Sequence, residues 1–589
     1  VIDDYQREYR WTRKHIEALI CDLEAAFYVS YKPMHAREDV ASYNSYYLGP
    51  IVMSEKEGKR AIIDGQQRLT SITLLLIYLQ GIQSSKIDKV DLTSLIYSEK
   101  YGKKSFNLEV PERQSCLNEI FTKGKYDISV DDDDSTINLV ERFADIHQLF
   151  PDDLKDEALP YFIDWLIGNV ILVVITAYTD ENAYTIFETM NDRGLNLTAS
   201  EMLKGYVLSK IIGSDNKKAV NEIWKKEIKK LHEYEKDEDL KFFQAWLRSK
   251  YAVSIRQGKA GSANEDFEKI GTRFHTWIKD NQTALGLKHS NDFLSFMKED
   301  FSFYSKLYRK LSDCQMELSK DLEHVYYANQ WGIAASLAVP LFLSPVLKTD
   351  TEEAVNQKLD LVGRFIETFA VYRAVNFRNF SASSIRYTMC NLVLEIRNKD
   401  VSELGKILKS KLEAMPENLS GIKELRMHGQ NKSFIKFFLS RITSYLERNG
   451  GNNSSVDHFL YNEGGKPYEI EHIWADKMSY HKDEFTQTEE FSKFRNMVGG
   501  LLLLPKGTNQ SFSDDPYDKK IQHYVKENIL ARSLNSQCYE KNPNFLSFIK
   551  SKNFAFKYHP AFKKKDLLER QSLYEEVANE VWSLSFFAK

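Results

Sequence analysis

The chain has 589 residues, of which 80 are Lys or Arg and 84 are Asp or Glu, so its formal net charge is −4. Since 42% of the residues are hydrophobic, the chain can bury large cores and divide into roughly two to four domains. The charge balance excludes a whole-chain field that favours nucleic acid or an anionic membrane. Any such binding must therefore come from local patches.

Cysteine usage and the longest apolar stretch indicate the compartment. The five cysteines lie far apart and form no C-x-x-C pair, which argues against a structural zinc site and a disulfide framework. This favours a reducing, cytoplasmic setting. Residues 331–347 are apolar but shorter than the roughly 20 residues of a membrane span, and they include two prolines. We expect a buried helix there and no membrane partner.

The first 212 residues mix candidate strands with candidate helices, which predicts an α/β or α+β domain. An acidic run at 131–134 predicts a solvated loop. The expected strands cover 46–53, 60–65 and 170–178, and the expected helices cover 12–28, 69–80 and 182–191.

The stretch "IIDGQQRLT" predicts a tight polar turn between a strand and a helix. Unpaired backbone N–H groups at a helix N-terminus favour anions, and an arginine can fork onto a phosphate. A phosphate or nucleotide site is one interpretation; a plain junction with an aspartate cap and a solvated arginine is the other. The polar residues are Asp64, Gly65, Gln66, Gln67 and Arg68.

Residues 181–208 have helix, turn, helix character. Gly194 supplies the turn, and Thr198 or Ser200 can cap the following helix. Asn191 and Arg193 crowd this turn, which is either structural or part of a ligand-facing loop.

Long, charged, amphipathic segments follow from 213 to 450 and predict an all-helical region. Within it, the polar stretch at 256–266 predicts a surface loop. The sequence "GGNNSS" at 450–455 favours a linker, so we expect a domain boundary near 450.

A second polar constellation follows a strand-like piece at 469–472. Glu471 and His472 are adjacent, and Asn509 comes after the apolar run at 501–504. A strand–turn–strand–helix hairpin would bring Glu471 and Asn509 together as oxygen ligands of Mg²⁺, with His472 deprotonating a water. The alternative is a structural histidine and a turn asparagine.

Residues 541–565 interleave seven lysines with aromatic residues and contain no acidic residue. Lysines contact phosphates and exposed aromatics stack on bases, so a DNA-binding face is one interpretation. A buried aromatic core with a solvated lysine rim is the other. The candidate DNA-binding residues are Lys552, Lys557, Lys563 and Lys564.

Four ordered motifs together resemble one family. They are "DYQREYRW" at 4–11, "DGQQRLT" at 64–70, "IFETMNDRGLNLT" at 186–198 and the Glu-His block. The chain resembles the GmrSD family of type IV, modification-dependent restriction endonucleases, with the related BrxU and SspE phage-defence nucleases.

The resemblance implies an α+β multidomain fold with three parts. A ParB-like nucleotide-binding domain would cover 1–212, a helical middle would cover 213–450, and an HNH (ββα-metal) nuclease domain would cover 451–589. The implied nucleotide-site residues are Gln6, Arg7, Asp64, Gly65, Gln66, Gln67 and Arg68, bordered by Asn191, Arg193 and Gly194.

In the nuclease domain, the resemblance implies that His472 is the general base. Glu471 and Asn509 would be the acidic and asparagine ligands of the metal, and Lys519 or Lys520 would be the later catalytic lysine. Gly500 stands where the family has its central HNH asparagine, and Asn496 is the candidate substitute. Ala475 and Asp3 also depart from the family pattern.

We therefore expect an NTP-responsive, Mg²⁺-dependent endonuclease of the bacterial cytoplasm that cuts phage DNA with modified bases or backbone. Dimerisation would help an enzyme with one nuclease site per chain to make double-strand breaks. The alternatives are a nucleotide-gated DNA sensor with a degenerate nuclease domain and an NTPase regulator of a partner protein.

Overall fold

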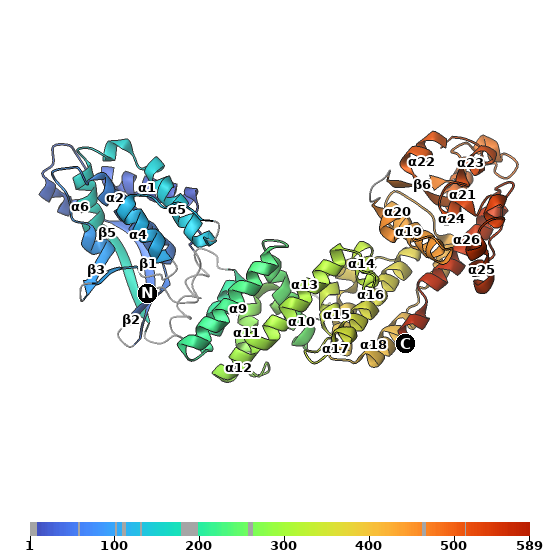
Figure 1. Cartoon of the computed structure of the whole chain (residues 1–589), viewed down its shortest axis with the longest axis horizontal. Helices are drawn as coiled ribbons and strands as arrows, with labels where there is room; N and C mark the ends of the chain where they lie inside the picture. Colours follow the sequence, from blue (N-terminus) through green and yellow to red (C-terminus); the bar gives the residue numbers. More distant parts are fainter. Residues whose placement is uncertain are drawn as a thin grey trace. The chain divides into compact units, whose positions relative to one another are not determined.

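The computed structural model describes residues 9–56, 59–100, 103–108, 113–129, 132–177, 198–256, 263–461, 467–512 and 514–588 (Figure 1). The chain forms two compact units. Unit 1 comprises Val1–Lys230 and Arg273–Glu299, and unit 2 comprises Leu231–Thr272 and Asp300–Lys589. Across the described residues, every helix is too short or too polar to span a membrane.

Unit 1 contains a three-stranded sheet of order β2-β1-β5. Strand β1 (Tyr46–Lys56) pairs antiparallel with β2 (Lys59–Asp64) and parallel with β5 (Val170–Ala177). The three expected strands are confirmed, and the mixed α+β character of the domain is confirmed with them. A short hairpin of β3 (Tyr97–Lys100) and β4 (Lys103–Phe106) lies apart from this sheet.

Helices supply most of the core of unit 1. In α1 (Arg13–Tyr28) the buried residues recur at helical spacing, because one face packs inward and the other meets water. The other helices of this part are α2 (Gln66–Ile82), α3 (Thr93–Ile96), α4 (Gln114–Lys123), α5 (Asp134–Leu149) and α6 (Leu159–Gly168). Their shared core includes Phe27, Leu74, Leu139, Ile163 and Trp165.

The acidic run at 131–134 is not simply a solvated loop. Helix α5 begins at Asp134, and the side chain of Asp133 accepts a hydrogen bond from Thr136 N at 2.7 Å. A carboxylate at this position satisfies a free N–H group of the first helical turn. The prediction of a loop holds for Asp132 and Asp133, whereas Asp134 begins α5 and residue 131 lies outside the described residues.

The all-helical region is confirmed in the described residues from 199 to 449. Unit 1 includes α8 (Ala199–Lys210), most of α9 (Ser214–His232) and α12 (Ser290–Ser295), and α11 (Asp266–Asp280) has a kink at Arg273. Unit 2 continues with α10 (Glu238–Lys250), α13 (Ser302–Met316), α14 (Glu323–Gln330), α15 (Ala335–Leu343), α16 (Glu352–Val375), α17 (Ala382–Ile396), α18 (Val401–Glu413) and α19 (Lys432–Asn449). Helix α15 is the buried helix expected within 331–347.

The last part of unit 2 surrounds a two-stranded sheet. Strand β6 (Tyr468–His472) pairs antiparallel with β7 (Leu501–Pro505), so the expected strand at 501–504 is confirmed. The helices around it are α20 (Val456–Leu460), α21 (Thr488–Arg495), α22 (Lys506–Phe512), α23 (Tyr517–Tyr524), α24 (Ile529–Arg532), α25 (Pro543–Lys552) and α26 (Lys564–Val581).

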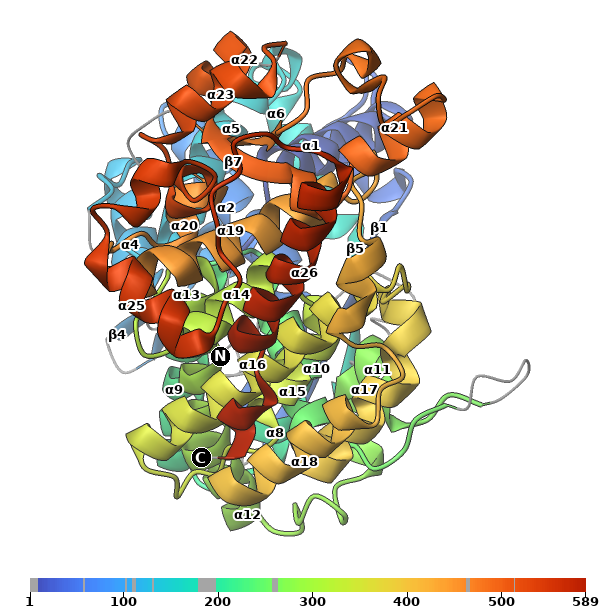
Figure 2. The same cartoon turned by 90° about the vertical axis from the view of Figure 1, so that its right-hand side faces the viewer.

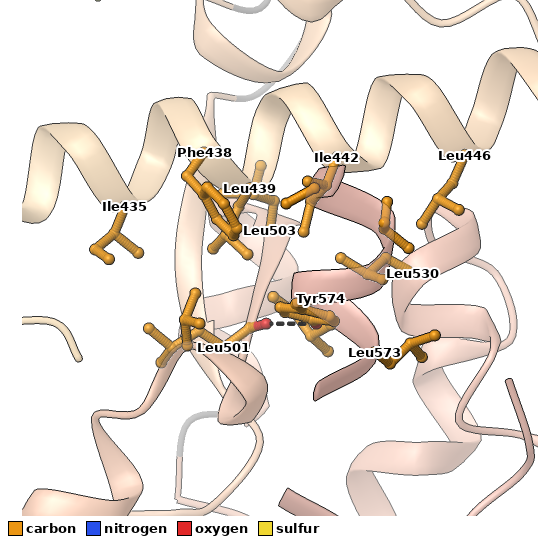
Figure 3. Packing of buried hydrophobic residues seen from close by; sticks show 14 of the residues in the cluster. Ile435, Phe438, Leu439, Ile442, Leu446, Leu501, Leu503, Leu530, Leu573 and Tyr574 are labelled. Carbon is orange, nitrogen blue, oxygen red and sulfur yellow. Dashed lines mark hydrogen bonds between the residues drawn. The ribbon is translucent and has the colours of Figure 1, made fainter. Parts of the chain in front are cut away.

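One hydrophobic core runs from the helical region into this last part. Helix α26 lies against α19 (Figure 2). Ile435, Phe438 and Ile442 of α19 face Leu501 of β7 and Tyr574 of α26, whose hydroxyl donates to the Leu501 carbonyl at 3.0 Å (Figure 3). The core is therefore continuous across residues 450–455, where we predicted a linker between domains.

Candidate active site

Strands β6 and β7 and helix α22 form the expected strand–strand–helix arrangement. His472 is the last residue of β6 and lies opposite Leu501, the first residue of β7. Helix α22 follows β7 directly and contains Asn509, whose side chain is outside the described residues. Because neighbouring residues of a strand face opposite sides, Glu471 is buried at 3% exposure while His472 is only partly buried.

The His472 ring is held by Asn496. Its Nε2 lies 3.0 Å from Asn496 Oδ1, and Asn496 Nδ2 donates to the Ser492 carbonyl at 2.9 Å. The second bond fixes the amide orientation, because only the NH₂ group can donate to a carbonyl. Nε2 must then carry the hydrogen, and the lone pair of the neutral ring is on Nδ1.

Burial lowers the pKa of His472 to about 4, and the positive charges of Arg495 and Lys520 act in the same direction. The Asn496 hydrogen bond and Asp476 oppose this shift but do not cancel it. The ring is therefore neutral at physiological pH, with Nδ1 able to accept a proton.

Glu471 faces the interior and has two donors. Its Oε1 accepts from Lys520 Nζ at 2.6 Å and from the Tyr524 hydroxyl at 3.2 Å. Lys520 Nζ also donates to the His472 carbonyl at 2.8 Å. Burial raises the pKa of Glu471 and lowers that of Lys520. Of the two candidate lysines, Lys520 makes these contacts, whereas Lys519 is exposed.

The expected Mg²⁺ site pairs Glu471 with Asn509, whose side chain lies outside the described residues. No group of three His, Cys, Asp or Glu side chains gathers among them in a way that could hold a metal ion. One carboxylate oxygen of Glu471 already accepts two hydrogen bonds. Glu471 and Asn509 as metal ligands therefore stay predictions.

The glycine at 500 has a close neighbour. A Cβ on Gly500 would lie 3.0 Å from Leu567 Cδ1, so an asparagine there would displace this side chain of α26. The Gly500 carbonyl accepts from Ile473 N at 2.9 Å, which joins the two strands at this point. The space at Gly500 is therefore tight, and Leu567 would have to shift for an asparagine to fit.

Gln571 of α26 supports the same turn. Its Oε1 accepts from Gly499 N at 2.5 Å, and its Nε2 donates to the carbonyls of Ile422 and Leu425 at 2.5 and 3.0 Å. Gln571 is buried. The sequence pattern contains no signal for this role, because Gln571 lies 72 residues from Gly499.

In unit 1, the predicted strand–turn–helix at the "DGQQR" loop is confirmed. Strand β2 ends at Asp64, Gly65 has φ of +93°, and α2 begins at Gln66. This φ favours glycine, and a Cβ there would lie 3.1 Å from Ile51 Cγ1. Gly65 itself is the N-cap and no side chain caps the helix, so the alternative with an aspartate cap is wrong.

Parts of three sequence motifs meet around this loop. Arg10 N donates to Gln67 Oε1 at 2.9 Å, and Arg10 Nη1 lies 3.4 Å from Glu201 Oε1. Glu201 forms a capping box with Thr198 at the start of α8, which confirms Thr198 as a cap. The candidate nucleotide-site residues Gln6, Arg7, Asn191, Arg193 and Gly194 lie outside the described residues, as does the expected helix at 182–191.

Arg68 lies against β1 in this structure. Its Nη1 donates to the Pro50 carbonyl at 2.7 Å. Gly49 has φ of +122°, and a Cβ there would lie 2.9 Å from Arg68 Cζ, so this glycine makes room for the guanidinium. Arg68 is thus not simply solvated, and its contact with a phosphate stays a prediction.

Most aromatic residues of the C-terminal basic stretch pack into the core, and Tyr558 is exposed. Phe545, Phe554 and Phe562 are buried, which favours the core interpretation over a stacking platform. Each candidate DNA-binding lysine lies beside a carboxylate: Lys552 and Glu580 at 2.5 Å, Lys557 and Glu569 at 2.5 Å, Lys563 and Asp483 at 2.6 Å, and Lys564 and Glu490 at 2.8 Å. Their role in DNA binding stays a prediction.

Comparison with protein-family models gives two matches. Residues 1–208 match the N-terminal domain of the GmrSD restriction endonuclease, and residues 417–558 match the C-terminal domain of the GmrSD restriction endonucleases. A search of curated proteins gave no match. The first matched segment includes the loop at 64–68, and the second includes His472 with both strands of its hairpin.

Proposed function

The chain belongs to the GmrSD restriction endonuclease family, and from this premise we propose that His472 is the general base of an HNH-type nuclease site. Membership of the family implies a restriction endonuclease that acts on modified DNA. The finer proposal is that an HNH hairpin in unit 2 hydrolyses the phosphodiester and that a ParB-like domain in unit 1 binds a nucleoside triphosphate.

The orientation of His472 carries the nuclease proposal. Ser492, Asn496 and His472 form a chain of hydrogen bonds that leaves Nδ1 with the lone pair, and burial keeps the ring neutral. A general base requires both properties. An ordinary structural histidine requires neither, so the geometry supports the catalytic interpretation.

The proposed chemistry follows from this arrangement. Nδ1 of His472 takes a proton from a water molecule while the water oxygen attacks the phosphorus of the DNA backbone. The bond from phosphorus to the leaving oxygen then breaks, and solvent protonates that oxygen. Asn496 Oδ1 stabilises the imidazolium that forms, because it accepts from Nε2.

Metal dependence is a separate prediction from the family resemblance. The predicted ligand Asn509 has its side chain outside the described residues, so no step of this chemistry is assigned to the ion. Cleavage that is abolished by EDTA and restored by excess Mg²⁺ would support the requirement.

The nucleotide proposal rests on the motifs that meet around the loop at 64–68. Arg10 connects Gln67 with Glu201 of α8, and Glu201 forms a capping box with Thr198, the last residue of the third motif. We propose that a nucleoside triphosphate binds at this loop and changes the activity of the nuclease site. A fluorescent nucleotide analogue titrated against the full chain measures the binding directly.

The sensor alternative rests on Gly500 in place of an asparagine. The packing of Leu567 over Gly500 and the support from Gln571 give this glycine a structural reason within the fold. Cleavage that disappears in His472→Ala distinguishes an active hairpin from a degenerate one.

A comparison of unmodified and modified DNA as substrates tests the proposed restriction activity. Purified protein is incubated with unmodified plasmid and with phage DNA that carries modified cytosines, with Mg²⁺, with and without nucleoside triphosphates. We expect cleavage of the modified DNA only. Equal cleavage of both DNAs would contradict modification dependence, and no cleavage across a wider panel of modifications would contradict the nuclease proposal.

A further inference from the structure

A loop of unit 2 adjoins the His472 site. Residues 426–432, here called the 426–432 loop, connect the turn at Leu419–Glu424 to α19. Arg426 pairs with Met497 in an antiparallel bridge, and Met427 N donates to the Asn496 carbonyl at 2.7 Å. The loop therefore runs beside the residue whose side chain holds the His472 ring.

The backbone of this loop is fixed from inside. Asn431 Oδ1 accepts from His428 N at 2.8 Å, and Asn431 Nδ2 donates to the Arg426 carbonyl at 2.9 Å. Asn431 thus closes the loop between the bridge with Met497 and the first turn of α19. The backbone of this loop therefore has a defined position beside Asn496.

Two cations of this loop have no carboxylate partner at ion-pair distance among the described residues. Its sequence, "RMHGQNK", has no acidic residue, and Arg426, His428 and Lys432 are exposed. Within the part of the chain that the structure describes, Arg426 and Lys432 form no ion pair. The C-terminal lysines, such as Lys552 and Lys557, differ in having carboxylate partners at 2.5 Å. A cation without a carboxylate partner can contact a phosphate without first breaking an ion pair.

A strained aromatic residue lies beside the same loop. Phe377 has φ of +55°, and its side chain is 50% exposed and stacks on His428 with ring centroids 6.2 Å apart. A left-handed conformation at a bulky residue costs about 1–3 kcal/mol, and exposure gives little burial in return. Arg373 holds this turn through the Asn379 carbonyl, to which its Nη2 donates at 2.6 Å. The turn therefore presents an exposed aromatic ring against His428 of the 426–432 loop.

We propose that the 426–432 loop and Phe377 bind the DNA backbone beside the phosphate that is cleaved. This inference rests on the proposed function, because it names the protein surface that contacts the DNA duplex at the proposed nuclease site. Arg426 and Lys432 bind phosphates that flank the one at His472, and the ring of Phe377 packs against a sugar of the same backbone. The paired C-terminal lysines are not this surface.

The salt dependence of DNA binding tests whether Arg426 and Lys432 contact phosphates. Affinity for a DNA duplex is measured between 50 and 200 mM salt in the His472→Ala protein, so that cleavage does not interfere. The double variant Arg426→Ala, Lys432→Ala is compared with Lys552→Ala, Lys557→Ala, which removes the same charge. The plot of log K against log salt falls, and each lost phosphate contact makes its slope less steep by about 0.9. For the loop variant only, we expect a slope that is less steep by about 1.8 and an affinity for DNA that is about tenfold weaker.

An unchanged slope in the loop variant, or an equal fall in the control variant, would overturn the inference while leaving cleavage by the unaltered enzyme intact. No DNA binding in any of these proteins would instead count against the proposed function. The two failures are therefore distinguishable.

Phe377→Gly tests the aromatic contact separately. Glycine adopts this φ without strain, so we expect an unchanged or higher Tm together with weaker DNA binding. An unchanged affinity would remove Phe377 from the proposed surface.

Discussion

At His472, several neighbours act on one ring. Burial and the positive charges of Arg495 and Lys520 lower its pKa, and Asn496 selects the nitrogen that carries the hydrogen. Position in the strand alone would give neither effect. The function proposed for this residue therefore depends on side chains that are remote in sequence.

Substitution of Asn496 is predicted to change the pH profile of cleavage. The rate of the unaltered enzyme should fall only as the pH drops toward about 4, because protonation of His472 removes the base. The hydrogen bond from His472 to Asn496 raises the His472 pKa. Asn496→Ala should therefore move the acidic limb to lower pH and slow cleavage by at least about tenfold at neutral pH, because the tautomer is no longer fixed.

Asn496→Asp should move the same limb to higher pH, because a carboxylate stabilises the imidazolium. A purely structural asparagine would give slower cleavage in both variants with no opposite shifts of the limb. Rates of kcat/KM measured across the pH range distinguish these outcomes.

The adjacent Glu471 and His472 alone left a structural histidine open, and the family resemblance singled out His472 together with Asn496 and the lysine pair at 519 and 520. The sequence did not give the contacts between them. The contact with Asn496 spans 24 residues and follows from the position of α21, which periodicity does not give. Which of Lys519 and Lys520 contacts Glu471 depends on which face of α23 is buried. The packing of the helix decides this, and the sequence does not show it.

At the scale of elements, the hairpin of β6 and β7 is held by two helices. Lys520 of α23 binds Glu471 and the His472 carbonyl, and Gln571 of α26 binds the turn at Gly499. A two-stranded sheet alone is marginally stable in water. These contacts therefore position the end of β6, where His472 lies.

Removal of the Lys520 charge is predicted to destabilise unit 2. Lys520→Met leaves the buried Glu471 carboxylate without its cation, and breaking a buried pair in this way costs about 3–5 kcal/mol. Lys519→Met, at the exposed neighbouring position, is the matched control and should leave Tm unchanged. Thermal unfolding measures both variants, and an equal Tm for the two would contradict the role given to the Glu471–Lys520 pair.

The helices and strands with strong apolar periodicity were predictable from the sequence. Which of them pack into one core was not. The strands at β1, β2, β5 and β7 and the helical region followed from apolar runs and spacing. Strand β5 nevertheless leaves Ile171, Val173 and Val174 exposed. The "GGNNSS" stretch favoured a boundary on composition. The core of α19, β7 and α26 nevertheless extends across it, since residues distant in the sequence supply the partner surfaces.

At the scale of the whole molecule, we propose that unit 1 binds the nucleotide and that unit 2 cleaves DNA. Coupling between such sites requires two states of the protein with different nucleotide affinity. We predict that DNA affinity or cleavage rate differs between the apo protein and the protein with a bound nucleoside triphosphate. Equal affinity and equal rate across nucleotide states would contradict coupling while leaving the nuclease site in place.

The most direct test of the central claim is the single-turnover cleavage rate of modified DNA by the unaltered protein and by His472→Ala. His523→Ala, at an exposed histidine of α23, is the control. If His472 is the general base, its removal should slow cleavage by about 10²–10⁴-fold while the control cleaves normally and both variants keep their Tm. Cleavage by His472→Ala at the rate of the unaltered protein would contradict the claim.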